Sequence, residues 1–302
     1  MIHTLDLQFQ RPRTIAAYLV ETGAGPALVE TGPESTYQQL RSELQERGVT
    51  PADLRAVFVS HIHLDHSGAA WRLVADGAPV VYVHPRGAPH LVNPSRLWES
   101  ASRIYGDQME KLWGRSGSVP EDRVRAVEDG ESVSVGEARF LALDTPGHAG
   151  HHHAWVLDGV VFSGDVGGVR IGGGPVVPPF PPPEINLELW KTSLDRLRAL
   201  GASEIRPTHF GAYDDVDAHL DDLEDRMFRW AEEVLEWMRE GHDESGMTRR
   251  FETLVREELL GADMDMSEDA LAEYEIADPA WMSIPGLVRY WQKTHPERLA
   301  SV

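Results

Sequence analysis

Short hydrophobic runs bounded by turn-forming residues recur between residues 14 and 206. Runs of this kind are typical of buried or half-buried β-strands. Two of them meet at Asp158-Gly159, a dipeptide that favours a two-residue hairpin turn. The pattern therefore predicts strands over residues 14–21, 27–30, 54–60, 79–84, 123–127, 132–135, 138–143, 151–157, 160–163 and 204–206.

Other segments space their hydrophobic residues three or four positions apart, which predicts amphipathic helices. The longest, 216–239, places Leu220, Leu223, Met227, Trp230, Val234 and Met238 on one face. Residues 167–183 are rich in glycine and proline and are predicted to form a loop. Helical spacing is also found over residues 36–47, 87–113, 188–200 and 242–302.

Two strand-rich halves with flanking helices predict a layered α/β (α+β) architecture with two sheets. We expect residues 1–241 to form one catalytic domain. Residues 242–302 are expected to form a helical C-terminal extension that serves as a lid or in dimerisation. Helix spacing does not separate these two roles.

Composition narrows the classes of function. The 302 residues carry a formal charge of -21 at pH 7, which repels phosphate backbones and argues against a nucleic-acid partner. The N-terminus lacks the apolar segment of a signal peptide, and no apolar stretch approaches the roughly 20 residues of a membrane helix. We therefore expect a cytoplasmic protein with a small-molecule substrate and no membrane partner, and a homo-oligomer on general grounds.

The chain contains no cysteine, so any metal site must use His, Asp and Glu, ligands that suit zinc, iron or manganese. Four such residues stand within six positions at His61, His63, Asp65 and His66, where a predicted strand ends. In extended backbone His61 and His63 point to the same side and can chelate one cation. The turn that follows can direct Asp65 and His66 toward a second cation. Burying these groups together without a cation would be costly.

Three further candidate ligands follow predicted strands in the same way. They are His148, Asp165 and His209. A single histidine or aspartate at a strand end is more often a surface or turn residue than a ligand. Together with the His61–His66 cluster, however, they point to a metal centre on loops held by a rigid scaffold.

In their order along the chain, these motifs resemble the metallo-β-lactamase-fold hydrolase superfamily, and within it the glyoxalase II-like enzymes. The resemblance covers residues 14 to 212 and includes Glu30-Thr31-Gly32 and Pro146-Gly147-His148. It implies a four-layer αββα sandwich with two divalent metal ions at one edge. Zinc is the first expectation for these ions, and iron or manganese are the alternatives.

The resemblance also implies a role for each ligand. His61, His63 and His148 would hold the first metal, Asp65, His66 and His209 the second, and Asp165 would bridge both. Asp65 would also orient a metal-bridging hydroxide and shuttle its proton during attack on an ester, thioester or lactone carbonyl. Glu30 stands where the family usually has Asp, and would support a ligand from behind.

Three alternatives to this hydrolase interpretation remain open. One is a mononuclear iron persulfide dioxygenase, which would use His61 or His63 with His148 and Asp165. The second is a phosphodiesterase. The third is a non-catalytic ligand-binding scaffold, which the full ligand set disfavours.

Candidate substrate contacts lie in the two segments that adjoin the ligands, 87–113 and 167–183, and just after His209. They are Trp98, Tyr105, Phe180 and Tyr213. For each of these aromatic residues, helix or core packing is an equally good interpretation. In the run His151-His152-His153, neighbouring residues of a strand face opposite ways, so all three cannot join one site.

Overall fold

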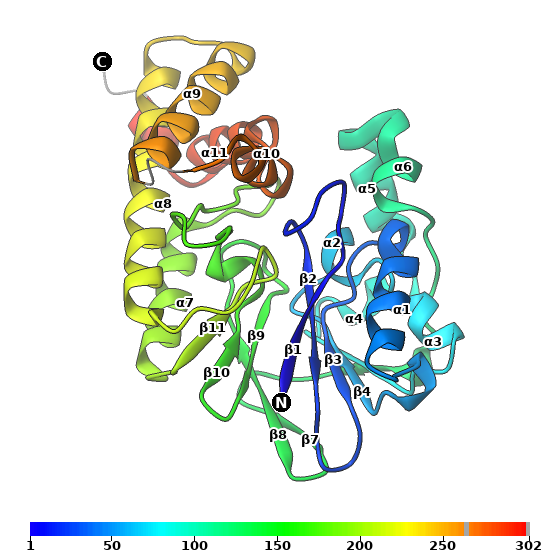
Figure 1. Cartoon of the computed structure of the whole chain (residues 1–302). Helices are drawn as coiled ribbons and strands as arrows, with labels where there is room; N and C mark the ends of the chain where they lie inside the picture. Colours follow the sequence, from blue (N-terminus) through cyan, green and yellow to red (C-terminus); the bar gives the residue numbers. More distant parts are fainter. Residues whose placement is uncertain (263–265, 300–302) are drawn as a thin grey trace.

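Two β-sheets form the middle of the molecule (Figure 1). The computed structural model describes residues 1–262 and 266–299. The first sheet has the order β1-β2-β3-β4-β5-β6, with antiparallel pairing from β1 to β3 and parallel pairing from β3 to β6. Its strands are β1 (Ile2–Asp6), β2 (Ala16–Val20), β3 (Ala27–Val29), β4 (Ala56–Phe58), β5 (Val81–Val83) and β6 (Val124–Ala126).

The second sheet has the order β11-β10-β9-β8-β7 and is antiparallel except for the parallel pair β10 and β11. Asp158 and Gly159 join β9 to β10 with φ angles of 49° and 81°, as the predicted hairpin requires. The strands are β7 (Ser132–Val135), β8 (Ala138–Asp144), β9 (His153–Leu157), β10 (Val160–Phe162) and β11 (Glu204–Arg206).

Helices cover the outer face of each sheet, which confirms the predicted helix, sheet, sheet, helix layering (Figure 1). One outer layer packs on the first sheet and contains α1 (Tyr37–Glu46), α2 (Leu64–Ser67), α3 (Ala70–Ala75), α4 (Ala88–Val92), α5 (Ser95–Tyr105) and α6 (Met109–Trp113). The other packs on the second sheet and contains α7 (Leu187–Ala199) and α8 (Val216–Arg239).

The helical C-terminal region is also confirmed, and it packs against α8 and the loop that precedes α7. Its helices are α9 (Glu244–Ala262), α10 (Glu268–Ala277), α11 (Ala280–Thr294) and α12 (Pro296–Leu299). Residues 263–265 and 300–302 of the predicted extension lie outside the described residues. The domain boundary after residue 241 stays a prediction. No helix in the described part of the chain is long and apolar enough to cross a membrane.

The sequence pattern missed β1. This strand lies at the edge of the first sheet, and Leu5 is its one fully buried residue. An edge strand shares few apolar contacts, so its sequence needs no clear hydrophobic run.

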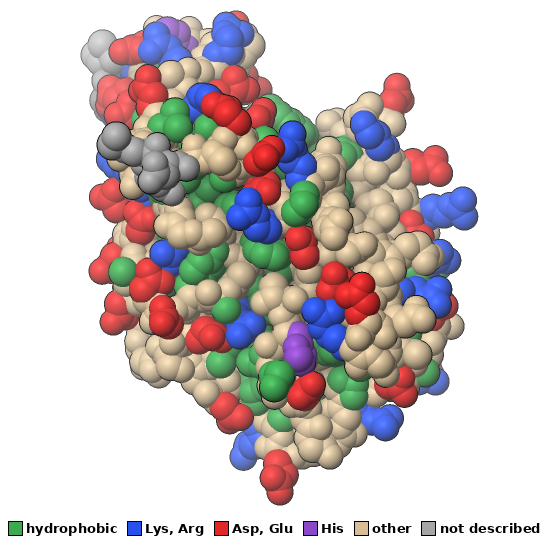
Figure 2. Space-filling model, viewed as in Figure 1, with side chains coloured by type: hydrophobic (Ala, Val, Ile, Leu, Met, Phe, Trp, Pro, Cys, Tyr) green, Lys and Arg blue, Asp and Glu red, His purple; other side chains and the backbone are tan. Residues whose placement is uncertain are grey.

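On the face drawn in Figure 2, acidic and basic side chains are interspersed. Ion pairs neutralise some acidic groups of the protein, for example Glu232, whose Oε1 lies 2.8 Å from Nη1 of Arg298.

Aromatic side chains hold the two sheets together. Phe58 at the end of β4 is fully buried, and its ring centre lies 4.3 Å from that of Phe140 and 4.8 Å from that of Trp155 in the opposite sheet. Tyr82, beside it in the first sheet, lies 5.1 Å away. Because His61 follows three residues later, this packing fixes the point from which the ligand-bearing loop leaves the sheet.

We predict that Phe58→Ala destabilises the fold by about 3–5 kcal/mol, because it opens a cavity between the sheets. Urea denaturation of the metal-free protein measures this loss in the free energy of unfolding. Leu189→Ala is the control, since Leu189 is 46% exposed on α7 and should change stability by less than about 0.5 kcal/mol. Equal losses in the two variants would contradict the role assigned to Phe58.

Candidate metal centre

The seven candidate ligands gather at one edge of the sandwich because the strands before them end there. His61 to His66 follow β4, His148 follows β8, Asp165 follows β10 and His209 follows β11. Strands β8 and β10 run in the same direction, since each is antiparallel to β9, and β11 is parallel to β10. Their carboxyl ends therefore open on the same edge as the end of β4, and residues distant in sequence meet there.

The first group of ligand atoms comes from His61, His63, His148 and Asp165. Nδ1 of His63 lies 2.8 Å from Nε2 of His61 and 3.2 Å from Nε2 of His148. Oδ2 of Asp165 lies 3.2 Å from Nε2 of His148. All four atoms lie within 4.8 Å of one another, which is close enough for one cation to be bound by all of them.

The second group comes from Asp65, His66, Asp165 and His209. Oδ1 of Asp165 lies 3.1 Å from Nε2 of His66 and 3.4 Å from Nε2 of His209. Oδ2 of Asp65 lies 3.4 Å from the same nitrogen of His209. Asp165 thus turns one carboxylate oxygen toward each group, so the two groups share it.

The histidines of the first group are held neutral. Burial lowers the pKa of His61 and of His63 well below the ordinary value, and the charges of neighbouring histidines lower both further. Burial also lowers the pKa of His148, although the charge of Asp165 opposes this. Neutral imidazole is the form that binds a metal, so this group needs no deprotonation near pH 7.

The histidines of the second group differ, because carboxylates surround them. Burial alone would lower the pKa of His66, but the charges of Asp165, Asp65 and Glu30 raise it well above the ordinary value. The pKa of His209 is raised by Asp165 and Asp65 against the same effect of burial. Burial works to raise the pKa of Asp65, yet the charge of His66 and the hydrogen bond with His209 lower it to about 2.

Two atoms at the centre are buried without hydrogen bonds. Nε2 of His66 and Oδ1 of Asp165 lie 3.1 Å apart, but neither makes a hydrogen bond of good geometry among the described residues. Leaving such atoms unsatisfied is costly, and a cation would satisfy both at once. The donor set, five histidines and two aspartates, fits zinc, iron or manganese.

Hydrogen bonds from the surrounding chain orient the ligands. Nδ1 of His148 donates to the carbonyl oxygen of Pro179 at 3.2 Å, and Nδ1 of His209 donates to that of Thr14 at 2.6 Å. Each bond places the ring proton on Nδ1 and leaves Nε2 free for a cation. The hydroxyl of Ser60 lies 3.0 Å from Nδ1 of His61 and thereby supports the first group.

Glu30 lies behind His66, where sequence reasoning placed a supporting residue. Its Oε1 lies 3.4 Å from Nδ1 of His66 and accepts hydrogen bonds from the backbone N–H of Ser60 and the hydroxyl of Thr208. One carboxylate therefore links the ligand loops after β4 and β11. The sequence does not predict that Ser60 and Thr208 donate to Glu30, since Ser and Thr are common in such loops.

The four predicted substrate contacts take different positions. Tyr105 lines the cavity that adjoins the ligands. Phe180 does not, because it is fully buried in the core against Trp190, which corrects the prediction for this residue. Trp98, a residue of α5, packs at the margin of the core and is not among the residues that line the cavity. Tyr213 also lies off the cavity lining, with its hydroxyl 2.5 Å from the carbonyl oxygens of Arg170 and Phe210.

The three consecutive histidines point to separate places, as predicted. His151 lines the cavity, and His152 binds the hydroxyl of Thr145 behind the ligands. His153 joins His84 and Asp144 in a third group that is compact enough for a metal ion. However, Nδ1 of His84 accepts the backbone N–H of Arg86, so its Nε2 carries the proton and donates to Asp144. That nitrogen has no lone pair left for a cation.

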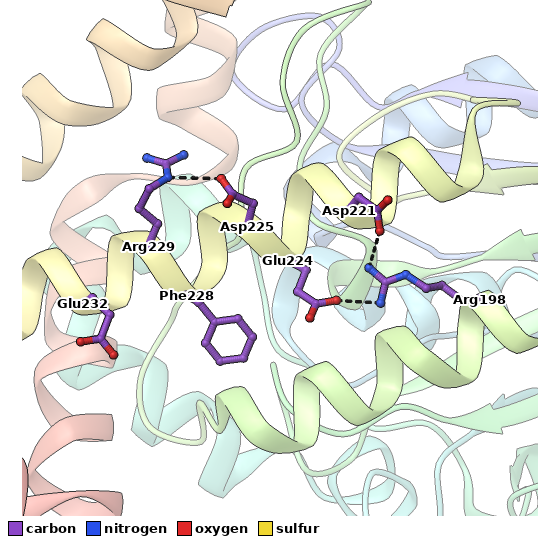
Figure 3. A pocket seen from close by; sticks show the side chains of 7 residues that line it. All are labelled: Arg198, Asp221, Glu224, Asp225, Phe228, Arg229 and Glu232. Atoms are coloured by element: carbon purple, nitrogen blue, oxygen red, sulfur yellow. Dashed lines mark hydrogen bonds and ion pairs between the residues drawn. The ribbon is translucent and has the colours of Figure 1, made fainter.

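A shallow groove lies on the surface between α7 and α8 (Figure 3). Its charged side chains are in ion pairs: Arg198 with Asp221 and Glu224, Arg229 with Asp225, and Glu232 with Arg298 outside the groove. Among the described residues, none that lines this groove belongs to a candidate metal-binding group. We therefore assign no function to it.

The sequence of this chain is similar to those of a known family of proteins. The family model described as the metallo-beta-lactamase superfamily matches residues 11–209. A metallo-beta-lactamase fold-containing protein of Sulfurisphaera tokodaii is 30% identical over 158 residues, which are 51% of this chain and 60% of that protein. The chain thus spans less than two-thirds of that relative's length.

Two further proteins bear on the fold and on the glyoxalase II-like resemblance. The crystal structure of a metallo-beta-lactamase family protein from Thermus thermophilus superposes with a TM-score of 0.69 at 23% identity, over 97% of this chain and 93% of that one. A hydroxyacylglutathione hydrolase of Vibrio cholerae is 29% identical over 114 residues, which are 38% of this chain and 33% of that enzyme. The likeness to glyoxalase II is therefore loose.

We predict that Gly164→Ala disturbs the metal centre. Gly164 has φ of 52°, and a Cβ there would lie 2.5 Å from Nε2 of His152 and 2.7 Å from Cβ of Ser60, which supports His61. The clash and the left-handed backbone together should cost about 2–4 kcal/mol of stability and weaken metal binding. Gly172→Ala is the matched control, because Gly172 has φ of 60° with no atom in the described residues within 4 Å of its Cβ position.

Thermal unfolding and metal titration of the two variants measure this difference. The control should lose only about 1 kcal/mol, from backbone strain, and keep its metal affinity. Unchanged metal binding in Gly164→Ala would contradict the close packing assigned to this position.

Proposed function

Because the chain belongs to the metallo-beta-lactamase superfamily, we propose that it is a hydrolase that uses two divalent metal ions to cleave an ester, thioester or lactone. Zinc is the expected metal, with iron or manganese as the alternatives. The observation that carries the proposal is the position of Asp165, whose two oxygens face two separate groups of ligands. A bridging carboxylate of this kind is suited to a pair of cations.

The ions would hold a water molecule, lower its pKa and polarise the carbonyl oxygen of the substrate. The chain's own residues keep them in place: His61, His63 and His148 at one position, and His66, His209 and Asp65 at the other. Because the ligands at the two positions are buried apart from part of His63 and Asp65, the reacting groups would be shielded from bulk water on the side of the sheets.

Asp65 is the residue proposed to move protons. It lines the cavity with 22% of its side chain exposed, so a substrate can reach it. The pKa of about 2 keeps its carboxylate ionised at neutral pH, and as a weak base it would accept a proton only from a water molecule that the two ions have made acidic. Transfer of that proton to the leaving oxygen or sulfur would complete the cleavage.

The alternative functions predict different outcomes. A persulfide dioxygenase would need one iron and would consume oxygen. A phosphodiesterase would cleave phosphoesters with the same ligands. The loose likeness to hydroxyacylglutathione hydrolase supports a thioester without identifying its thiol.

We predict close to two equivalents of zinc, iron or manganese in the purified protein, with hydrolysis of esters or thioesters. Elemental mass spectrometry and a panel of esters, thioesters, lactones and phosphodiesters measure both. His63→Ala and Asp165→Ala should lose metal and lower kcat/KM at least about a thousandfold, with the fold retained. The control Asp195→Ala changes an exposed carboxylate on α7 and should leave both values unchanged.

One equivalent of iron with oxygen consumption on a persulfide, and no hydrolysis, would replace the proposal by the dioxygenase. A protein that binds no metal after reconstitution would refute it altogether.

We predict that the second equivalent of metal binds less tightly as pH falls, whereas the first changes little. The raised pKa values of His66 and His209 mean that, in the metal-free protein, these rings keep their protons to a higher pH than an ordinary imidazole does, and a cation must displace them. Binding there should weaken as pH falls from 8 to 6, by up to about tenfold per pH unit for each proton that the cation displaces. The lowered pKa of His61 leaves no such competition at the first position.

Titration with zinc against a competing chelator at pH 6, 7 and 8 measures the two affinities. Calorimetry in buffers of different ionisation enthalpy counts the protons released with each equivalent. Equal pH dependence of both equivalents would contradict the assignment of charge to the two groups.

A further inference from the structure

A cavity of about 760 Å³ leads away from the ligands between two parts of the chain that are far apart in sequence. One wall is formed by α5 and α6, and the other by the end of α10 and the start of α11. Figure 1 shows these helices at the same end of the molecule, on either side of it. His63, Asp65 and His209 line the inner end, so a substrate bound at the metal centre must extend into this space.

The walls of this cavity are largely apolar. Leu97 and Ala101 of α5 face it from one side, and Ile276 and Met282 face it from the other. The two walls also touch: the ring of Tyr105 lies 5.6 Å from that of Trp281, edge to face. An apolar space partly closed by aromatic rings favours an apolar ligand.

The C-terminal wall is fixed to the rest of the protein. Arg13, in the loop after β1, pairs with Glu273 of α10 at 2.9 Å. The hydroxyl of Tyr274 donates to the carbonyl oxygen of Pro175 at 2.6 Å and accepts the backbone N–H of Ile171. These contacts are partly or fully buried, so the wall is part of the folded site.

Four carboxyl groups line this cavity away from the metal centre, and Asp278 is the buried one, whereas Glu184, Glu252 and Glu275 are exposed. Asp278 lies between α10 and α11, is 9% exposed and lines the cavity. Its Oδ1 accepts a hydrogen bond from the hydroxyl of Ser283 at 2.8 Å, while Oδ2 is buried with no partner among the described residues. Burial raises the pKa of Asp278 to about 7, although Ser283 and the charge of His209 act to lower it. A polar ligand group would satisfy this oxygen.

We propose, building on the hydrolase function above, that the substrate carries an apolar acyl chain seated between α5 and α10–α11, and that Asp278 binds a hydroxyl group on that chain. A hydroxyl can donate to a carboxylate and can also accept from a carboxylic acid, so it suits Asp278 in either protonation state. The metal centre would hold the carbonyl end, and Asp278 would select among chains of similar length.

Binding of straight-chain carboxylic acids from butyrate to dodecanoate tests the apolar part. Tryptophan fluorescence reports it, since Trp113 and Trp281 line the cavity. Affinity should rise about three- to fourfold per methylene until the cavity is filled, in the metal-loaded and the metal-free protein. Ala272→Trp, which fills the cavity from α10, should abolish this rise. Ala199→Trp, at an exposed position of α7, should preserve it.

Decanoate and its 3-, 6- and 10-hydroxy derivatives test Asp278. At least one hydroxy acid should bind about three- to tenfold more tightly than decanoate. Asp278→Leu should lose this preference while binding decanoate as well as before, and Asp278→Asn, whose amide can still hydrogen-bond, should keep it. A merely structural Asp278 would weaken all four ligands alike. Absence of any preference in the unaltered protein would overturn its assignment.

The outcomes separate this inference from the function on which it rests. Strong binding of long acids without hydrolysis of any ester would refute the hydrolase and leave the acyl site standing. Hydrolysis of acetyl esters with no gain in affinity or kcat/KM for longer chains would refute the acyl site and leave the hydrolase standing.

Discussion

The burial of seven ionisable side chains in one space is the constraint on which the rest of this structure depends. Five imidazoles and two carboxylates lose their hydration when they are buried together, and without a cation the like charges among them repel one another. The two histidine groups differ in charge. Burial lowers the pKa of His61 in the first group, whereas the carboxylates of Asp65 and Asp165 raise the pKa of His66 in the second. A centre arranged in this way is ready for cations and poorly satisfied without them.

Sheet topology supplies the geometry that this centre needs. The ligands come from four loops, and those loops meet because β4 of one sheet and β8, β10 and β11 of the other end at the same edge. The core of the sandwich, centred on Phe58, holds the sheets at a fixed separation. Glu30 then connects two of these loops, because it accepts hydrogen bonds from Ser60 after β4 and from Thr208 after β11. The packing of the two sheets and these hydrogen bonds together determine the positions of the ligands.

Much of the fold and the ligand set could be predicted because both have local signals. Helix α8 spans the predicted residues 216–239, and the His61–His66 cluster is dense enough to stand out in the sequence. Strand β1 has no such signal, because it lies at the edge of its sheet and buries only Leu5 fully. The same holds for Phe180, whose burial is decided by contacts with Trp190 and α11 that no local pattern encodes. Asp278 was missed for the same reason.

In the proposed acyl site, the C-terminal helices add a wall to the metal centre. The ligand groups lie within residues 61 to 209, which the superfamily model spans, whereas the second wall of the cavity comes from residues 272–282, beyond it. The carbonyl chemistry and the choice of acyl group would therefore reside in different parts of the chain. Because ion pairs and buried hydrogen bonds lock the two parts together, changes in the wall can alter selectivity without moving a ligand.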